Sequence, residues 1–189
     1  MKSIVFISLM KSDPSISQCP IARSLDRVGE WWSILILRDA LAGLSRFDQF
    51  QESLGIAPNM LTRRLNDLVA AGVLERRRYC EHPPRYEYIP TERGRDFRPV
   101  LIALLEWGNK HFAREGVSMQ IVDAATGEPA EPVLVDRKSG RVLTSDEFVI
   151  GPGPAANERT LGRVALIAQT RTKRLASAPT AKRSKRATS

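Results

Sequence analysis

Two helical patterns joined by a short turn, between residues 46 and 71, constrain the fold of this 189-residue chain more than any other feature. The first helix is expected over residues 46–53, and the glycine and proline of residues 55–58 indicate a turn. The second helix begins near Pro58, because proline suits the first position of a helix, and it stops at Gly72. A short helix, a turn containing glycine and a longer helix form the order of a helix-turn-helix motif.

Helical spacing of apolar residues predicts further helices on both sides of this pair. Upstream, one helix is expected over residues 20–28 and a second, apolar on most sides, over residues 30–42. Downstream, a long helix is expected over residues 91–113, with its first turns bent or broken at Pro99. The apolar stripe of this last helix is wider than a small core can cover, which predicts a partner surface.

Between the helix-turn-helix and the last helix lies a segment with strand-forming residues and many arginines. Two short strands, residues 73–79 and 85–89, flank a turn that contains proline, so a β-hairpin is expected. Because side chains alternate along a strand, Arg76 and Arg78 should face one side and Arg77 the other. Helices followed by such a basic hairpin, or wing, predict a mostly α fold with a small β-wing, an α+β winged helix-turn-helix.

Composition divides the chain into four segments. A flexible N-terminal arm is expected over residues 1–18, the winged domain over 19–115, and a small β-hairpin appendage over 117–151. The rest, residues 152–189, is predicted to be a disordered basic tail, because it has too few apolar residues to stay folded alone, although residues 161–167 could form one or two helical turns. The whole net charge of +8 lies in this tail, so the remainder of the chain is neutral overall.

A helix that enters the major groove of DNA needs polar side chains opposite its buried stripe. Arginine can pair with guanine and asparagine with adenine, so the second helix of the motif is a candidate reader of base edges. In the wing, arginines would lie along the phosphate backbone or in the minor groove. The alternative is an ordinary solvated helix face beside a charged edge strand. The candidate residues are Pro58, Asn59, Thr62, Arg63, Arg64 and Asn66 in the helix, and Arg76, Arg78 and Arg85 in the wing.

Several local motifs occur together over residues 17–113. They are CPIARSLDRVGEWWSILILRD (19–39), RFDQF (46–50), LTRRL (61–65), LVAAGVLER (68–76), PPRYEY (83–88) and TERG (91–94). In combination they resemble the HxlR-type winged helix-turn-helix regulators, which are MarR-like. The resemblance implies a sequence-specific regulator of transcription, a repressor or an activator, that binds a twofold operator in double-stranded DNA as a homodimer.

The same resemblance implies that the first and last helices build the dimer. The expected interface residues are Ile21, Leu101, Leu104, Leu105, Trp107 and Phe112. One departure from the family is Pro90, which stands where the family tends to have leucine. Because proline cannot donate a hydrogen bond to a strand ladder, a shortened second wing strand is expected.

The segment 117–154 resembles the C-terminal appendage of longer family members, which carries a zinc-ribbon-like pair of turns containing cysteine. Residues 123–127 and 136–140 keep the spacing and the glycines of those turns but contain no cysteine. Without soft ligands no metal site is expected there, and no cofactor is predicted for the chain.

Cys19 precedes a proline at a helix N-terminus, where the helix dipole favours the thiolate. Some members of the family sense quinones, aldehydes or disulfide stress through a cysteine at this position, so the resemblance implies an oxidant or electrophile switch at Cys19. The alternative is a small half-buried apolar residue at the dimer interface. Cys80, in the wing turn, has no evident activating partner beyond the neighbouring arginines.

Other function classes are disfavoured by the sequence. No phosphate-binding loop, dinucleotide fingerprint or nucleophile elbow occurs, so an enzyme is not expected. The apolar run over residues 4–10 is too short to span a membrane, and two cysteines indicate a reducing compartment, hence a cytoplasmic, nucleoid-associated protein. The remaining alternative is a winged-helix module that docks a protein and does not touch DNA.

Overall fold

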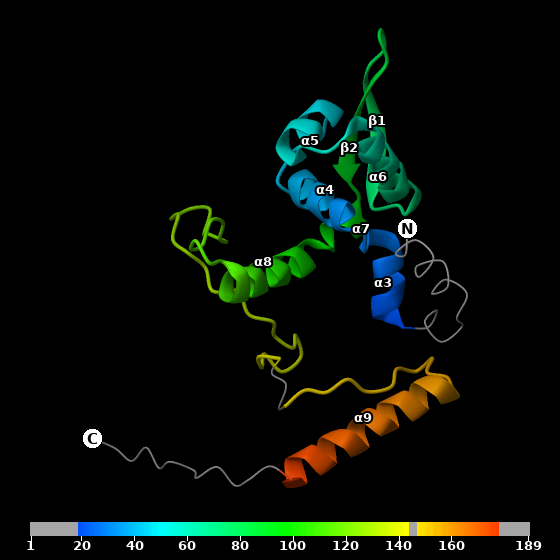
Figure 1. Ribbon diagram of the computed structural model, residues 1–189, viewed down its shortest axis with the longest axis vertical. Coiled ribbons are helices and arrows are strands. Elements are labelled where there is room, and N and C mark those ends of the chain that lie inside the picture. The colour runs from blue at the N-terminus through cyan, green and yellow to red at the C-terminus, as the bar shows by residue number, and fades with distance from the viewer. Residues whose placement is uncertain (1–18, 144–146, 178–189) are drawn as a thin grey trace. The chain divides into compact units, whose positions relative to one another are not determined.

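The computed structural model describes residues 19–143 and 147–177 (Figure 1). The chain forms two compact units, with the boundary between Leu134 and Val135. The predicted flexible arm, residues 1–18, and the last part of the predicted tail, residues 178–189, lie outside the described residues. No helix in the described part of the chain is long and apolar enough to cross a bilayer.

The first unit has the mixture of helices and one hairpin that the sequence predicts, so the mostly α fold with a β-wing is confirmed. Between residues 19 and 90, each predicted helix and strand is present within one or two residues of its expected bounds. In chain order the elements are α3 (Pro20–Val28), α4 (Trp31–Leu41), α5 (Phe47–Leu54), α6 (Pro58–Ala70), β1 (Leu74–Cys80), β2 (Arg85–Pro90), α7 (Glu92–Arg95) and α8 (Arg98–Phe112).

The helix predicted over residues 91–113, with its first turns bent or broken at Pro99, is divided into α7 and α8. The hydroxyl of Thr91 caps α7 by accepting a hydrogen bond from the Gly94 amide at 3.2 Å. Pro99 lies in the first turn of α8, where a backbone N–H would have no partner within the helix, so the proline costs no helical hydrogen bond. A proline cannot continue the ladder of a preceding helix, so α7 ends at Arg95 and α8 starts at Arg98, with two residues between them.

The wing is an antiparallel pair, β1 and β2, with an irregularity between Arg78 and Cys80 near its tip. Pro90 does not shorten the second strand as expected, because it is the last residue of β2 and pairs with Leu74. At this end position its missing N–H removes no internal ladder bond. The next residue, Thr91, supplies the donor instead, to the Val73 carbonyl at 3.1 Å.

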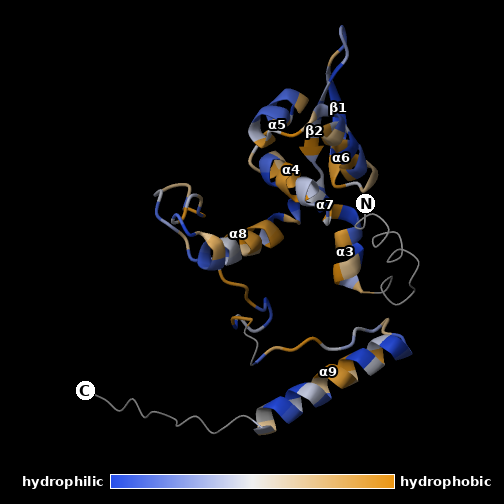
Figure 2. Cartoon of the chain, viewed as in Figure 1, coloured by the Kyte–Doolittle hydropathy of each residue, from blue (hydrophilic) through white to orange (hydrophobic). Residues whose placement is uncertain are grey.

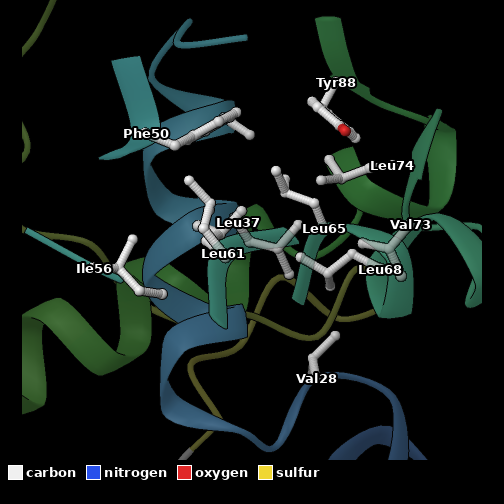
Figure 3. Close-up of a cluster of buried hydrophobic side chains, with 12 residues drawn as sticks. Val28, Leu37, Phe50, Ile56, Leu61, Leu65, Leu68, Val73, Leu74 and Tyr88 are labelled. Carbon is white, nitrogen blue, oxygen red and sulfur yellow. The ribbon is translucent and has the colours of Figure 1, made fainter. Parts of the chain in front are cut away.

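The core of the first unit is formed where α4, α5 and α6 meet the base of the wing (Figure 3). Phe50 of α5 and Leu37 of α4 pack beside Leu61, Leu65 and Leu68 of α6, and all five side chains are fully buried. Each large apolar side chain removed from water stabilises the fold by about 1.5–3 kcal/mol. The complete cluster is Val28, Ile36, Leu37, Ala40, Phe50, Ile56, Leu61, Leu65, Leu68, Val73, Leu74 and Tyr88.

A buried carboxylate adds a polar link between two of these helices. Asp39 of α4, 6% exposed, accepts a hydrogen bond from the Ser53 hydroxyl of α5 at 2.7 Å. Its second oxygen pairs with the Arg38 guanidinium at 2.7 Å. A buried charge is tolerated only with such partners, so this network fixes α5 against α4.

Among the described residues of the predicted β-hairpin appendage, the strand pairing is reduced to two single antiparallel bridges, Val122 with Pro129 and Val135 with Val142. The two bridges fall in different units of the chain. Val122, Val135 and Val142 are each about half exposed, so these segments bury too little apolar surface to extend into strands. The β-formers of this region predict more sheet than the structure contains.

The predicted disorder of the basic tail is wrong for residues 158–177, which form α9 (Glu158–Ser177). Asn157 begins this helix, because its side-chain oxygen accepts a hydrogen bond from the Thr160 amide at 2.9 Å. Glu158 lies in the first turn, where the helix dipole favours an acid. Alanine, leucine, arginine and glutamine, which have high helix propensity, make up much of the rest.

Candidate nucleic-acid interface

Helix α6 has two opposite faces of different chemistry. Leu61, Leu65 and Leu68 are fully buried and recur at the spacing of one helix face. The residues between them point outward, so the buried stripe holds α6 in place while the other face stays in solvent. The exposed residues on that face are Pro58, Asn59, Thr62, Arg63 and Asn66.

The hydrogen bonds of these exposed residues are local. The Thr62 hydroxyl donates to the Pro58 carbonyl at 2.8 Å, and the Asn59 side chain accepts from the Met60 amide at 2.8 Å. The side chain of Arg63 makes no hydrogen bond or ion pair with any residue that the structure describes. Its guanidinium therefore remains available for a bidentate contact outside the chain.

Arg64 does not belong to this outward face, contrary to the prediction. Its side chain is only 11% exposed and lies 3.4 Å from the Glu30 carboxylate and 3.1 Å from that of Asp67. The Arg64 Nε atom is buried and has no hydrogen-bond partner within the described residues. Arg64 thus fastens α6 to the junction of α3 and α4, where Glu30 precedes the first turn of α4.

The register of the wing sorts its arginines as expected. Arg76 is opposite Tyr88 and Arg78 is opposite Tyr86, so both arginines share one face. Arg77 is opposite Glu87 on the other face, and the two form an ion pair at 2.7 Å. The predicted division of the three successive arginines is therefore confirmed.

The arginines of the wing differ in how far their charge is neutralised. Arg78 pairs with Glu81 at 3.0 Å beside the wing turn. Arg76 stacks on the ring of Tyr86, with 3.6 Å between its guanidinium carbon and the ring centroid. Arg85 is exposed and has no ionic partner in the described part of the chain. Arg76 and Arg85 thus keep an uncompensated positive charge, and Arg76 keeps it in a fixed position.

Arg46 is a residue of this surface that sequence reasoning missed. Arg46 precedes α5, and its backbone forms an isolated antiparallel β-bridge with Glu87 of β2. Its guanidinium carbon lies 4.8 Å from the centroid of the Tyr79 ring. A cavity of about 380 Å³ separates the start of α5 from the wing, and Arg46 and Arg85 are among its lining residues. The only signal in the sequence was a basic residue directly before the first helix of the motif.

The residues predicted for a dimer interface lie on α3 and α8, and most of them are exposed in the single chain. Ile21 is 66% exposed, Trp107 57% and Phe112 63%. Leu104 is also exposed, whereas Leu101 and Leu105 are half-buried. Figure 2 shows that both α3 and α8 contain hydrophobic residues. Apolar side chains of this size gathered on a surface are typical of an association site.

Cys19 is the N-cap residue of α3, as predicted, and it is half-buried. Its carbonyl accepts a hydrogen bond from the Arg23 amide at 3.0 Å. Cys80 lies at the end of β1, with its sulfur 3.7 Å from the His82 carbonyl. Neither cysteine takes part in a disulfide.

The two turns that resemble zinc-ribbon turns are closed by aspartate. The Asp123 carboxylate accepts hydrogen bonds from the amides of Ala125 and Thr126 at 2.8 and 3.0 Å, which lower its pKa. The Asp136 carboxylate accepts from the Ser139 hydroxyl at 2.6 Å and from the Ser139 amide at 3.0 Å, and these bonds lower its pKa in the same way. Within the described ranges no three His, Cys, Asp or Glu side chains come together as a metal site.

Comparison with known proteins gives one consistent result. The family model of the HxlR-like helix-turn-helix matches residues 27–116. An uncharacterised HTH-type transcriptional regulator of Mycobacterium tuberculosis is 38% identical over 135 residues, which cover 71% of this chain and 85% of that protein. The chain belongs to the HxlR-like family of helix-turn-helix transcriptional regulators.

Other relatives of this HxlR-like regulator agree with the assignment. An HTH-type transcriptional regulator of Synechocystis is 39% identical over 111 residues, which cover 58% of this chain and 80% of that protein. Among solved structures, a Pseudomonas aeruginosa protein assigned as a transcription factor is 55% identical, with a TM-score of 0.58, and the match covers 77% of this chain and 99% of that one. A second such structure, PA1607, is 37% identical with a TM-score of 0.65, over 72% of this chain and 96% of that one.

Proposed function

We propose that this HxlR-like regulator binds a twofold operator in double-stranded DNA as a homodimer and thereby represses or activates nearby genes, working in the cytoplasm at the nucleoid. The observation that carries the proposal is the outward face of α6. Thr62, Arg63 and Asn66 are exposed on a helix whose opposite side is locked into the core. A rigid helix with polar side chains on its free face fits the major groove and the base edges displayed there.

The wing supports the same placement on DNA. Arg76 is held by stacking on Tyr86, and Arg85 has no ionic partner among the described residues. Arginines in such a hairpin contact phosphates or enter the minor groove, where they position the protein more than they read sequence. Together α6 and the wing would cover the groove and the adjoining backbone of one half-site.

Dimerisation is proposed from the uncovered apolar side chains of α3 and α8. Trp107 and Phe112 pack edge to face at 4.8 Å, yet both stay more than half exposed in the single chain. A second copy of the chain would cover these rings and would place a second α6 on the duplex. Two copies related by a twofold axis match an operator with two half-sites.

The test is a gel-shift titration with the DNA upstream of this protein's own gene and of its neighbours. We expect a retarded complex that contains two protomers for each operator, resistant to competition by an excess of unrelated duplex of equal length. A winged-helix module that only docks proteins would give no retarded complex at any protein concentration. A complex that unrelated duplex competes away equally would contradict sequence-specific reading.

We also propose that Cys19 switches operator binding when it reacts with an oxidant or an electrophile. The thiol is placed at the N-cap of α3, where the helix dipole stabilises the thiolate. A quinone would react by addition: one carbon–sulfur bond forms and the thiol proton ends on the quinone oxygen, with no further reactant. The adduct would add bulk at the start of a helix proposed to carry the dimer interface.

Treatment with p-benzoquinone is therefore expected to weaken operator binding of the unmodified chain by about tenfold or more, a change of about 1.4 kcal/mol in binding free energy. The Cys19→Ser variant should bind the operator normally and keep that affinity after treatment, because it lacks the nucleophile. Cys80→Ser is the matched control and should respond like the unmodified chain. Fluorescence anisotropy of a labelled operator measures the affinity of all three proteins before and after treatment. If the Cys19→Ser variant loses as much affinity as the unmodified chain, Cys19 is not the residue that switches binding.

A further inference from the structure

We propose that α9 is a second DNA-binding surface, which contacts the phosphate backbone without reading sequence. This inference rests on the proposed function, because it assumes that the first unit brings duplex DNA to the protein. The charges and faces of α9 itself carry the inference.

The charge of α9 is strongly one-signed. Its twenty residues, Glu158–Ser177, include five arginines or lysines and a single acid, Glu158, for a net charge of +4. Arg163, Lys173 and Arg174 are exposed and form no ion pair with any described residue. A surface with this much positive charge is complementary to a polyanion. Because the chain belongs to a family of helix-turn-helix regulators, duplex DNA is the polyanion that we propose.

The helical geometry collects these cations on one side. At about 100° per residue, Arg163, Lys173 and Arg174 fall within an arc of roughly 100°, with the exposed Leu166 between them. Leu161, Val164 and Ala168 fall on the opposite side, and Figure 2 shows α9 with both hydrophilic and hydrophobic surface. A disordered segment of the same composition would have no such side.

The length of the cationic face suits a duplex. Arg163 and Lys173 are ten residues apart, or about 15 Å along a helix. A duplex carries one phosphate charge for each ~1.7 Å of its axis, so several phosphates lie within this length.

An anionic membrane is the competing partner for a basic helix, and the sequence of α9 favours DNA over it. Helices that lie in a bilayer interface usually carry Trp, Phe or Leu along a broad apolar face. Residues 158–177 contain no aromatic residue, and alanine occupies part of the apolar side. Binding of α9 to an anionic membrane is therefore the alternative result that the experiment below detects.

The test uses the full chain and a duplex without an operator. In the variant Arg163→Gln/Lys173→Gln/Arg174→Gln, the slope of log affinity against log salt concentration should fall in magnitude by about 2 to 3 per protomer, since each lost phosphate contact contributes about 0.9. The matched control Arg114→Gln/Arg137→Gln/Lys138→Gln removes the same charge from exposed positions outside α9 and should keep the original slope. Equal slopes for the α9 variant and the unmodified chain would overturn the proposal.

A second pair of variants separates a helical surface from a simple polycation. Ala168→Pro keeps every charge but breaks α9 near its middle, and it should lower the slope, whereas Ala168→Ser should not. Loss of helical circular dichroism confirms the break. An unchanged slope in the broken helix would show that charge alone matters and would overturn the role of the one-sided face.

Two further measurements distinguish a failure of this inference from a failure of the proposed function. The α9 variant should retain its preference for operator over unrelated duplex, because that preference is assigned to α6. If no DNA binds at all, the proposed function and this inference both fail; if the operator binds with an unaltered slope, only this inference fails. Sedimentation with phosphatidylglycerol vesicles tests the membrane as the alternative partner. If the α9 substitutions abolish binding to these vesicles but leave the salt slope of DNA binding unchanged, α9 binds membranes and the proposal is overturned.

Discussion

Replacing Arg63 by alanine is expected to lower operator affinity by about 5- to 150-fold, or about 1–3 kcal/mol, without unfolding the protein. The side chain is exposed on the outer face of α6 and has no partner among the described residues, so its loss leaves the core intact. In the proposed complex its guanidinium pairs with a base edge, and one bidentate contact has this magnitude. Anisotropy titrations against the operator and against operators changed at one position measure the effect.

The pattern of the loss identifies what Arg63 touches. A base contact predicts weaker binding to the operator together with relaxed preference at one base pair in each half-site. A phosphate contact predicts equal losses on operator and unrelated duplex. The control Arg137→Ala removes the same charge from an exposed position in the second unit, and its operator affinity should change far less. An unchanged affinity for the Arg63→Ala variant would show that the outer face of α6 does not enter the groove.

Replacing Leu65 by alanine is expected to lower the free energy of unfolding by about 2–5 kcal/mol. Leu65 is fully buried in the cluster that joins α6 to α4, α5 and the wing, so the shorter side chain loses apolar contact and leaves a cavity. Because a domain of this size is stable by only about 5–15 kcal/mol, the variant should be markedly less resistant to urea and heat. DNA binding should fall only in proportion to the unfolded fraction.

The neighbouring residue supplies the control for this experiment. Asn66 is exposed, so Asn66→Ala should change the free energy of unfolding by no more than about 0.5 kcal/mol. Both variants are measured by urea denaturation at one fixed protein concentration, because the stability of a dimer depends on concentration. A loss below about 1 kcal/mol for the Leu65→Ala variant would contradict the packing of α6 described above.

Much of the winged domain was predictable from sequence because its signals are local. Prolines at the first turns of α3, α6 and α8 and glycines after α3 and α5 fix helix ends by backbone geometry alone. Gly55, for example, adopts the left-handed conformation, φ 59°, that ends α5 before the turn. The outward direction of Arg63 follows in the same way from the helical repeat and the leucine stripe of α6.

The features that the sequence did not predict depend on partners distant in the chain. Arg64 follows Arg63 directly, yet it turns inward because Glu30, more than thirty positions earlier, lies beside α6. Arg46 joins the wing surface only because Tyr79 provides a ring beneath it. The order of α9 was missed for a different reason: low apolar content predicts disorder, whereas capping by Asn157 and helix propensity act independently of that content.

The aspartate-closed turns determine the conditions under which this part of the chain keeps its shape. Hydrogen bonds from backbone amides at Asp123, and from the Ser139 hydroxyl at Asp136, hold the pKa of both carboxyls below the ordinary value. Groups with a depressed pKa stabilise the folded turn above that value and lose their effect only as pH falls through the acid range. The donors belong to the chain itself, so we expect both turns to keep their shape in the presence of a chelator.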